Sequence, residues 1–107
     1  MDCLPKAIGL VRRGVPGEHG TDLHALAERY GYRLVFTVGL EVRPLVAAMA
    51  LAQHVGDHAA TAVVVPTYEH AEAYRMIVTE LAALITPVRF YRRGHRWPAT
   101  AAEGRWR

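Results

Sequence analysis

Four short apolar runs constrain the fold of this 107-residue chain more than any other feature. The runs at 7–11, 34–38 and 62–65 are rich in aliphatic and β-branched residues and lack polar alternation, which is typical of strands covered on both faces. The fourth run, 88–92, alternates in part between apolar and basic residues, so we expect one face or edge of it to meet water. Four strands are therefore predicted.

Apolar residues at helical spacing predict three helices between these strands, over 23–30, 44–55 and 74–84. Gly31 follows the first helix and Gly56 the second, and glycine commonly stands just after the end of a helix. The resulting order, β-α-β-α-β-α-β, predicts right-handed crossovers and a three-layer α/β sandwich with a mostly parallel four-stranded sheet.

The composition, with 51% hydrophobic and 21% charged residues, fits one globular domain, which we place at residues 1–91. The longest uninterrupted apolar run, 45–52, holds eight residues, whereas a membrane-spanning helix needs about 20. No charged-then-apolar leader precedes the first strand, so we expect a cytoplasmic protein without membrane contact. The single cysteine, Cys3, excludes an internal disulfide and a cysteine metal site.

The basic charge is concentrated near the C-terminus. Residues 87–107 hold six basic side chains and one acidic one, whereas residues 1–86 hold seven basic and nine acidic ones. We interpret 92–107 as a basic, loosely ordered tail. Cations mixed with an aromatic ring can follow a nucleic-acid backbone and stack on a base, although arginine is also the default cation of this chain on any solvated surface. The candidate nucleic-acid-binding residues are Arg92, Arg93, Arg96 and Trp97.

A glycine-rich loop joins the first strand to the first helix. In an open α/β sheet, ligands bind beyond the carboxyl ends of the strands, which is where this loop begins. Its glycine spacing matches neither the dinucleotide-binding nor the P-loop pattern, so ordinary turn glycines and a helix-capping Thr21 are the alternative interpretation. The candidate anion-binding residues are Arg12, Arg13, Gly17, Gly20 and Thr21.

His54 and His58 are four residues apart with Asp57 between them, a spacing that can hold a metal ion on one helix face. Gly56 is predicted to end the helix between the two histidines, and no third ligand is placed beside them. We therefore interpret both as surface histidines. The sequence predicts no metal site and no cofactor.

Several segments resemble the catalytic domain of resolvase/invertase-type serine recombinases. Residues 9–14, GLVRRG, followed by a loop and an amphipathic helix, are similar to the first strand of that family. Residues 43–45, RPL, and the pair Gly56-Asp57 resemble the start of its second helix and the turn before its third strand. Residues 63–65, VVV, and the pair Glu69-His70 fall where the family carries a valine-rich strand and an Asp-Arg pair. The resemblance implies a resolvase-like fold for nearly all of the predicted domain.

The departures from that family concern its active site. The resemblance implies a nucleophilic serine after the first strand, but Gly14 stands there and the chain contains no serine. Glycine has no side-chain oxygen to attack a phosphodiester. Phosphoryl transfer also needs positive charge around the reacting phosphorus, and a histidine and a glutamate replace the family's expected arginine and aspartate. The sequence thus predicts no catalytic activity, with degenerate active-site positions at Arg12, Gly14, Arg43, Glu69 and His70.

Three functions remain open on these grounds. The leading hypothesis is a catalytically inactive, resolvase-like domain that acts as a protein-interaction or regulatory module, self-associating through its third helix or an exposed apolar face. The second is nucleic-acid binding by the basic tail together with Arg12, Arg13 and Arg43. The third is a binder of a small phosphate ligand, or an enzyme acting on one, at the loop 14–20.

Overall fold

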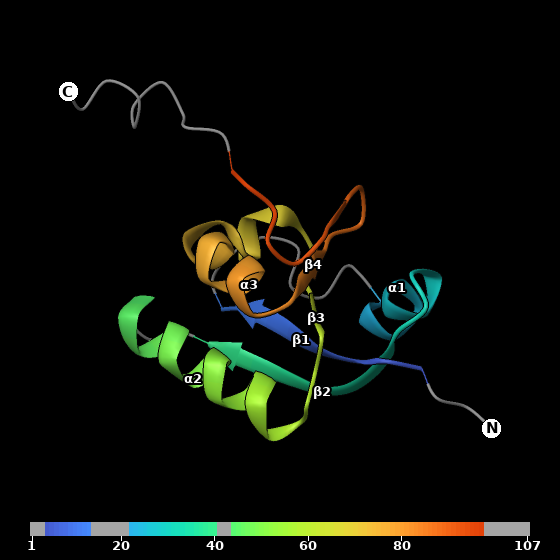
Figure 1. The fold of residues 1–107 in the computed structure, drawn as a ribbon, viewed down its shortest axis with the longest axis horizontal. Coiled ribbons are helices and arrows are strands. Elements are labelled where there is room, and N and C mark those ends of the chain that lie inside the picture. The colour runs from blue at the N-terminus through green and yellow to red at the C-terminus, as the bar shows by residue number, and fades with distance from the viewer. Residues whose placement is uncertain (1–3, 14–21, 41–43, 98–107) are drawn as a thin grey trace.

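The structure, a computed structural model, describes residues 4–13, 22–40 and 44–97. Within these ranges the strands are β1 Lys6–Arg12, β2 Arg33–Leu40, β3 Ala62–Val64, β4 Ala83–Ile85 and β5 Phe90–Tyr91. The helices are α1 Leu23–Arg29, α2 Pro44–Asp57 and α3 Arg75–Leu81, with two short 3-10 helices, η1 Tyr68–His70 and η2 Glu72–Tyr74. The chain is therefore of the α/β class, as predicted (Figure 1).

The strands form one mixed sheet in the order β2-β1-β3-β4-β5. The first four are parallel to their neighbours, and β5 runs antiparallel to β4. The predicted four-stranded sheet is therefore wrong, because the predicted third helix, 74–84, ends early. Ala82 has extended backbone angles, φ −161° and ψ 176°, and the next three residues form β4. Periodicity alone does not distinguish a short apolar strand from the last turn of a helix.

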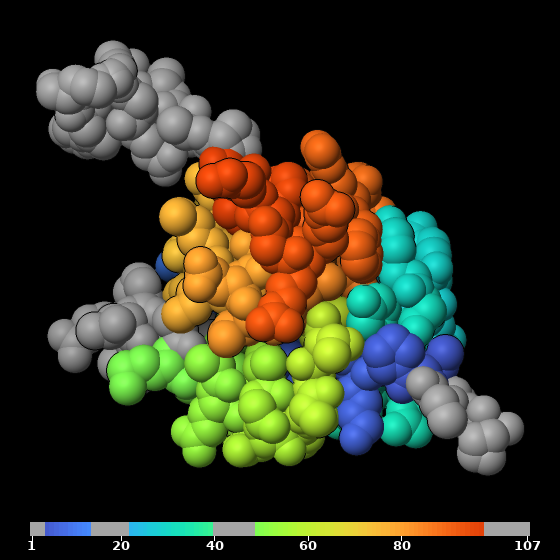
Figure 2. All heavy atoms as spheres, in the orientation of Figure 1, coloured from blue at the N-terminus to red at the C-terminus, as the bar shows by residue number. Residues whose placement is uncertain are grey.

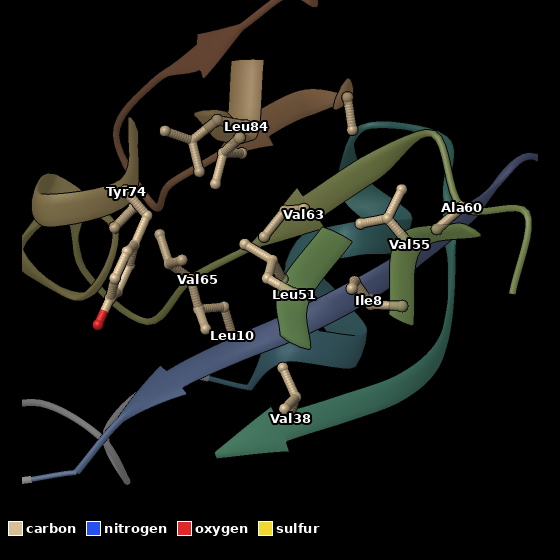
Figure 3. Packing of buried hydrophobic residues seen from close by; sticks show 13 residues of the cluster. Ile8, Leu10, Val38, Leu51, Val55, Ala60, Val63, Val65, Tyr74 and Leu84 are labelled. Atoms are coloured by element: carbon tan, nitrogen blue, oxygen red, sulfur yellow. The ribbon is translucent and has the colours of Figure 1, made fainter. Parts of the chain in front are cut away.

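Side chains that alternate along the strands build two separate apolar clusters. Ile8, Leu10, Val63 and Leu84 belong to the cluster that also holds residues of α2 and α3 (Figure 3). Their neighbours in the strands face the other way and pack with Leu26 and Ala27 of α1. Helices thus cover both faces of the sheet, which is compatible with the predicted three layers. Burial of each Leu, Ile or Val side chain contributes about 1.5–3 kcal/mol to folding.

Gly9 sets the close approach of α1 to the sheet. A Cβ atom at this position would lie 2.9 Å from Leu23 Cδ1 and 2.9 Å from Thr37 Oγ1. Real Cβ atoms almost never come that near to another heavy atom, so a larger residue here would force the Leu23 and Thr37 side chains to shift. A glycine in a strand often marks such a close approach.

The segment after β5 lies against α3. Trp97 Nε1 donates to Thr79 Oγ1 at 2.9 Å, Arg93 Nε donates to the Glu80 carbonyl at 3.2 Å, and Gly94 N donates to the Thr79 carbonyl at 2.7 Å. Figure 2 shows this segment, coloured red, over the orange atoms of α3. The first six residues of the predicted tail therefore pack on the domain, and residues 98–107 lie outside the described part. No described helix is long and apolar enough to cross a membrane.

Candidate functional site

The sheet order creates a topological switch point between β1 and β3. The chain passes from β1 to β2 on one side of β1, and then returns to β3 on its other side. Connections that leave in opposite directions open a crevice outside the carboxyl ends of the two central strands, and this is where ligands bind in open α/β sheets. In this sheet the switch point lies beyond Arg12, the last residue of β1, and beyond Val64, the last residue of β3.

His70 links the end of β1 to η1, the 3-10 helix that follows β3. The backbone N–H of Arg12 donates to His70 Nδ1 at 2.9 Å, and the His70 side chain is 0% exposed. Because Nδ1 accepts this hydrogen bond it carries no proton, which leaves the proton of the neutral ring on Nε2. Two positions that the recombinase resemblance singled out are therefore in contact. Their contact is structural, since it joins η1 to β1 through a backbone group.

Tyr74 extends the same site. Its ring lies below the Arg12 guanidinium, 5.6 Å from Cζ to the ring centroid, and only 3% of the residue is exposed. Figure 3 shows its hydroxyl at the border of the apolar cluster, directed away from Leu10 and Val65. This contact places a cation beside a tyrosine at the carboxyl end of the sheet.

Two buried hydroxyl groups in this region lack hydrogen bonds. Neither the Tyr74 hydroxyl nor Thr67 Oγ1 has a hydrogen-bond partner in the structure as described, and we call this pair the unpaired hydroxyls. Thr67 precedes η1, and its carbonyl accepts a hydrogen bond from the His70 backbone N–H at 3.1 Å. Tyr74 ends η2, the next 3-10 helix. Both hydroxyls therefore belong to the segment 67–74, which the His70 ring joins to β1. A buried polar group left unsatisfied costs about 1–3 kcal/mol. A ligand that accepts hydrogen bonds here would recover that cost.

The remaining residues of the predicted anion site are only partly described. Arg13 is exposed, and its Nε would lie 3.5 Å from a Cβ atom at Gly39, which places the guanidinium beside the end of β2. Glu69 is exposed in η1. Five predicted positions lie outside the described residues, namely Gly14, Gly17, Gly20, Thr21 and Arg43.

The predicted nucleic-acid residues lie elsewhere, around α3. Arg92 and Arg96 are exposed, whereas the Trp97 ring is half-buried. Its contacts are made within the molecule: the Arg75 guanidinium lies 5.2 Å from its centroid, and the Tyr91 ring lies 4.6 Å from it. The indole therefore holds its own segment in place. Nucleic-acid binding by this segment stays a prediction.

A hollow of about 450 Å³ is lined by residues of α3 and of the last described segment. Its lining includes the acidic residue Glu80 together with His95 and Arg96. Opposite charges side by side weaken the attraction for an anion. The Arg12 end of the sheet, where a guanidinium lies over the Tyr74 ring, suits an anion better.

Sequence reasoning missed Thr67 and Tyr74. Tyr74 was interpreted as an apolar helix position, and its ring does pack in the core, but nothing in a sequence reveals that a buried hydroxyl lacks a partner. Among the residues that the structure describes, no group of three or more His, Cys, Asp or Glu side chains is arranged to hold a metal ion.

Comparisons with known proteins identify no relative. The chain matches no protein-family model, no curated protein and no solved structure.

Proposed function

We propose that this chain is a catalytically inactive, resolvase-like domain that binds a phosphate-bearing ligand at the carboxyl ends of β1 and β3. The observation that carries the proposal is the Tyr74 hydroxyl, which is buried without a hydrogen-bond partner in the described structure and belongs to the ring under the Arg12 guanidinium. The second unpaired hydroxyl belongs to Thr67, the residue before η1, which His70 joins to the Arg12 backbone. Each hydroxyl has a donor hydrogen with no acceptor in the described structure, and the guanidinium supplies positive charge. Their location at the switch point is the usual ligand position in sheets of this topology.

Phosphate is the ligand class that this chemistry favours. Its oxygens are strong acceptors that carry negative charge, so they take hydrogen bonds from hydroxyl groups and from a guanidinium fork at once. A neutral polar ligand would satisfy the hydroxyls but would gain nothing from Arg12. An apolar ligand would leave all three groups unsatisfied.

Binding without catalysis is supported by the residues that replace the recombinase active site. Gly14 offers no nucleophile, and the chain has no serine. His70, at a position where the family resemblance implies an arginine, engages the backbone of Arg12 through Nδ1. A domain that holds a phosphate group without transferring it fits a regulatory or interaction module, which was the leading hypothesis.

The direct test is thermal unfolding with increasing inorganic phosphate at constant ionic strength, with chloride as the reference anion. A ligand bound only to the folded state adds about 2.7 kcal/mol at 100 times its Kd, which for a domain of this size raises Tm by roughly 10–20 °C. An equal Tm in phosphate and chloride, up to molar salt, would remove the proposal.

Tyr74→Phe separates binding from folding, because it deletes only a hydroxyl that has no partner in the described structure. The free protein should be as stable as the parent or slightly more stable, since an unsatisfied buried group is removed. Phosphate affinity should fall about tenfold, the effect of one hydrogen bond to a charged group. Tyr32→Phe is the matched control, on a half-buried tyrosine that packs with the α1 cluster. Equal phosphate affinity in Tyr74→Phe and the parent would contradict the proposed contact.

Self-association through α3 stays a separate prediction. Met76 and Ile77 of this helix are exposed apolar side chains, so a homodimer that uses them would bury both. The phosphate site does not depend on it, since neither residue belongs to the carboxyl end of the sheet.

A further inference from the structure

Helix α2 continues past the glycine that was predicted to end it. The helix runs to Asp57, and the backbone N–H of His58 donates to the His54 carbonyl at 3.1 Å. A glycine inside a helix costs about 1 kcal/mol relative to alanine, which weakens a helix without stopping it. The expectation that Gly56 separates the two histidines is therefore wrong. Side chains four residues apart on continuous helical backbone lie on the same face.

The two imidazole rings lie together beside a phenylalanine of β2. Their centroids are 6.4 Å apart and their planes differ by 23°. Phe36 stacks with both, at 5.0 Å from His54 and 4.9 Å from His58. Both histidines are partly exposed and Phe36 is 38% exposed. Stacking on Phe36 limits the rotation of the two imidazole rings, although solvent still reaches them. The histidines therefore lose less side-chain entropy on binding a ligand than two unrestrained histidines would.

We propose that His54 and His58 form a binding site for a divalent ion of the Cu²⁺ or Ni²⁺ class, with one nitrogen from each imidazole and water in the remaining positions. Imidazole is a preferred ligand of these ions. Metal–nitrogen bonds of about 2.0–2.1 Å place two ligating nitrogens within roughly 4 Å of each other. With the ring centroids 6.4 Å apart, only a small change of the side-chain torsions is needed to bring one nitrogen of each ring to that separation.

The ligand count determines which ion is favoured. Structural zinc sites take four protein ligands in a tetrahedron, and among the described residues no third His, Cys, Asp or Glu completes a set here. Two imidazoles with several waters suit the tetragonal or octahedral geometry of Cu²⁺ and Ni²⁺. The Irving–Williams order then predicts that affinity decreases from Cu²⁺ to Ni²⁺ to Co²⁺.

This site is independent of the proposed phosphate site. α2 leads into β3, so its last turn lies near the amino ends of the strands, whereas Arg12 and Tyr74 lie at the carboxyl ends. The failure of one proposal therefore leaves the other intact.

Calorimetric titration of the intact chain with NiCl₂ and with CuCl₂ tests the site. All variants carry Cys3→Ala, which removes the thiol as a competing ligand. His54→Gln and His58→Gln should each lower the affinity of one metal-binding event by at least about tenfold, because a single imidazole then holds the ion where two held it before. His24→Gln is the matched control, since His24 is exposed on α1. Unchanged binding in both histidine variants, or an equal loss in His24→Gln, overturns the proposal.

A second measurement needs no variant. Substoichiometric Cu²⁺ is paramagnetic and should broaden the NMR signals of the His54, His58 and Phe36 rings before those of other side chains. Broadening that begins elsewhere in the chain and leaves these three rings sharp overturns the proposal as well.

Discussion

The two regions that hold the η1–α3 segment in place differ in how their polar groups are satisfied. Around Trp97, the indole N–H, the Thr79 hydroxyl and the Arg93 side chain all have hydrogen-bond partners. Around Tyr74, the unpaired hydroxyls have none among the described residues. Buried polar groups in native proteins are nearly always paired. The first region is therefore complete as a structural contact, and the second is the region where we propose that a ligand binds.

The largest effect is expected at the link between β1 and η1. His70→Ala removes a fully buried ring and leaves the Arg12 backbone N–H without its acceptor. A cavity and an unsatisfied donor together should lower the free energy of unfolding by about 3 kcal/mol. Urea denaturation measures this change.

His70→Asn is the control for that experiment, because an asparagine side-chain oxygen can accept from the Arg12 N–H. It should recover part of the lost stability. A His70→Ala protein as stable as the parent would show that the link between η1 and β1 contributes nothing.

Trp97→Ala should have the next largest effect. The ring is half-buried, contacts Tyr91 and lies under Arg75, so its loss should cost about 2 kcal/mol, less than for a fully buried tryptophan. Phosphate affinity should not change, because the Trp97 ring contacts the η1–α3 segment at Tyr68 and Arg75, outside the proposed ligand contacts. A loss of phosphate binding in this variant, with the fold intact by circular dichroism, would mean that the two regions are coupled.

The smallest effects are expected from a threonine-to-valine substitution, made once in each of the two regions. Thr79→Val removes a hydroxyl that accepts from Trp97 and donates to the Arg75 carbonyl, and should cost about 1–2 kcal/mol. Thr67→Val removes a hydroxyl with no partner in the described structure, and should leave the stability of the free protein within about 0.5 kcal/mol of the parent. Equal losses in the two variants, measured by urea denaturation, would remove the contrast between the regions.

The first three strands and first two helices were predictable because each is a local pattern. The runs at 7–11, 34–38 and 62–65 became β1, β2 and β3 with small changes at their ends. Residues 83–85 were not predictable in the same way. Leu84 continues the helical spacing of α3, yet it lies in a strand beside β3, because pairing with a buried neighbouring strand outweighs a local preference.

The candidate site shows the same division. Arg12 and His70 were both singled out from the sequence, through the recombinase resemblance, but the hydrogen bond between the Arg12 backbone and the His70 ring joins residues 58 positions apart. No local pattern indicates such a contact. The same is true of His54 and His58. They share a helix face only because α2 continues through Gly56, which the sequence alone did not indicate.

The amino-acid sequence by itself determined the α/β class, the order of the early elements and the absence of a serine nucleophile, because these depend on residue identity and on short-range periodicity. The tertiary structure alone decided the strand order, the switch point between β1 and β3, and which buried hydroxyls lack partners. Those properties arise when segments distant in the chain pack together and exclude water. The free energy gained by that burial exists only once the fold has assembled, so no local pattern contains it.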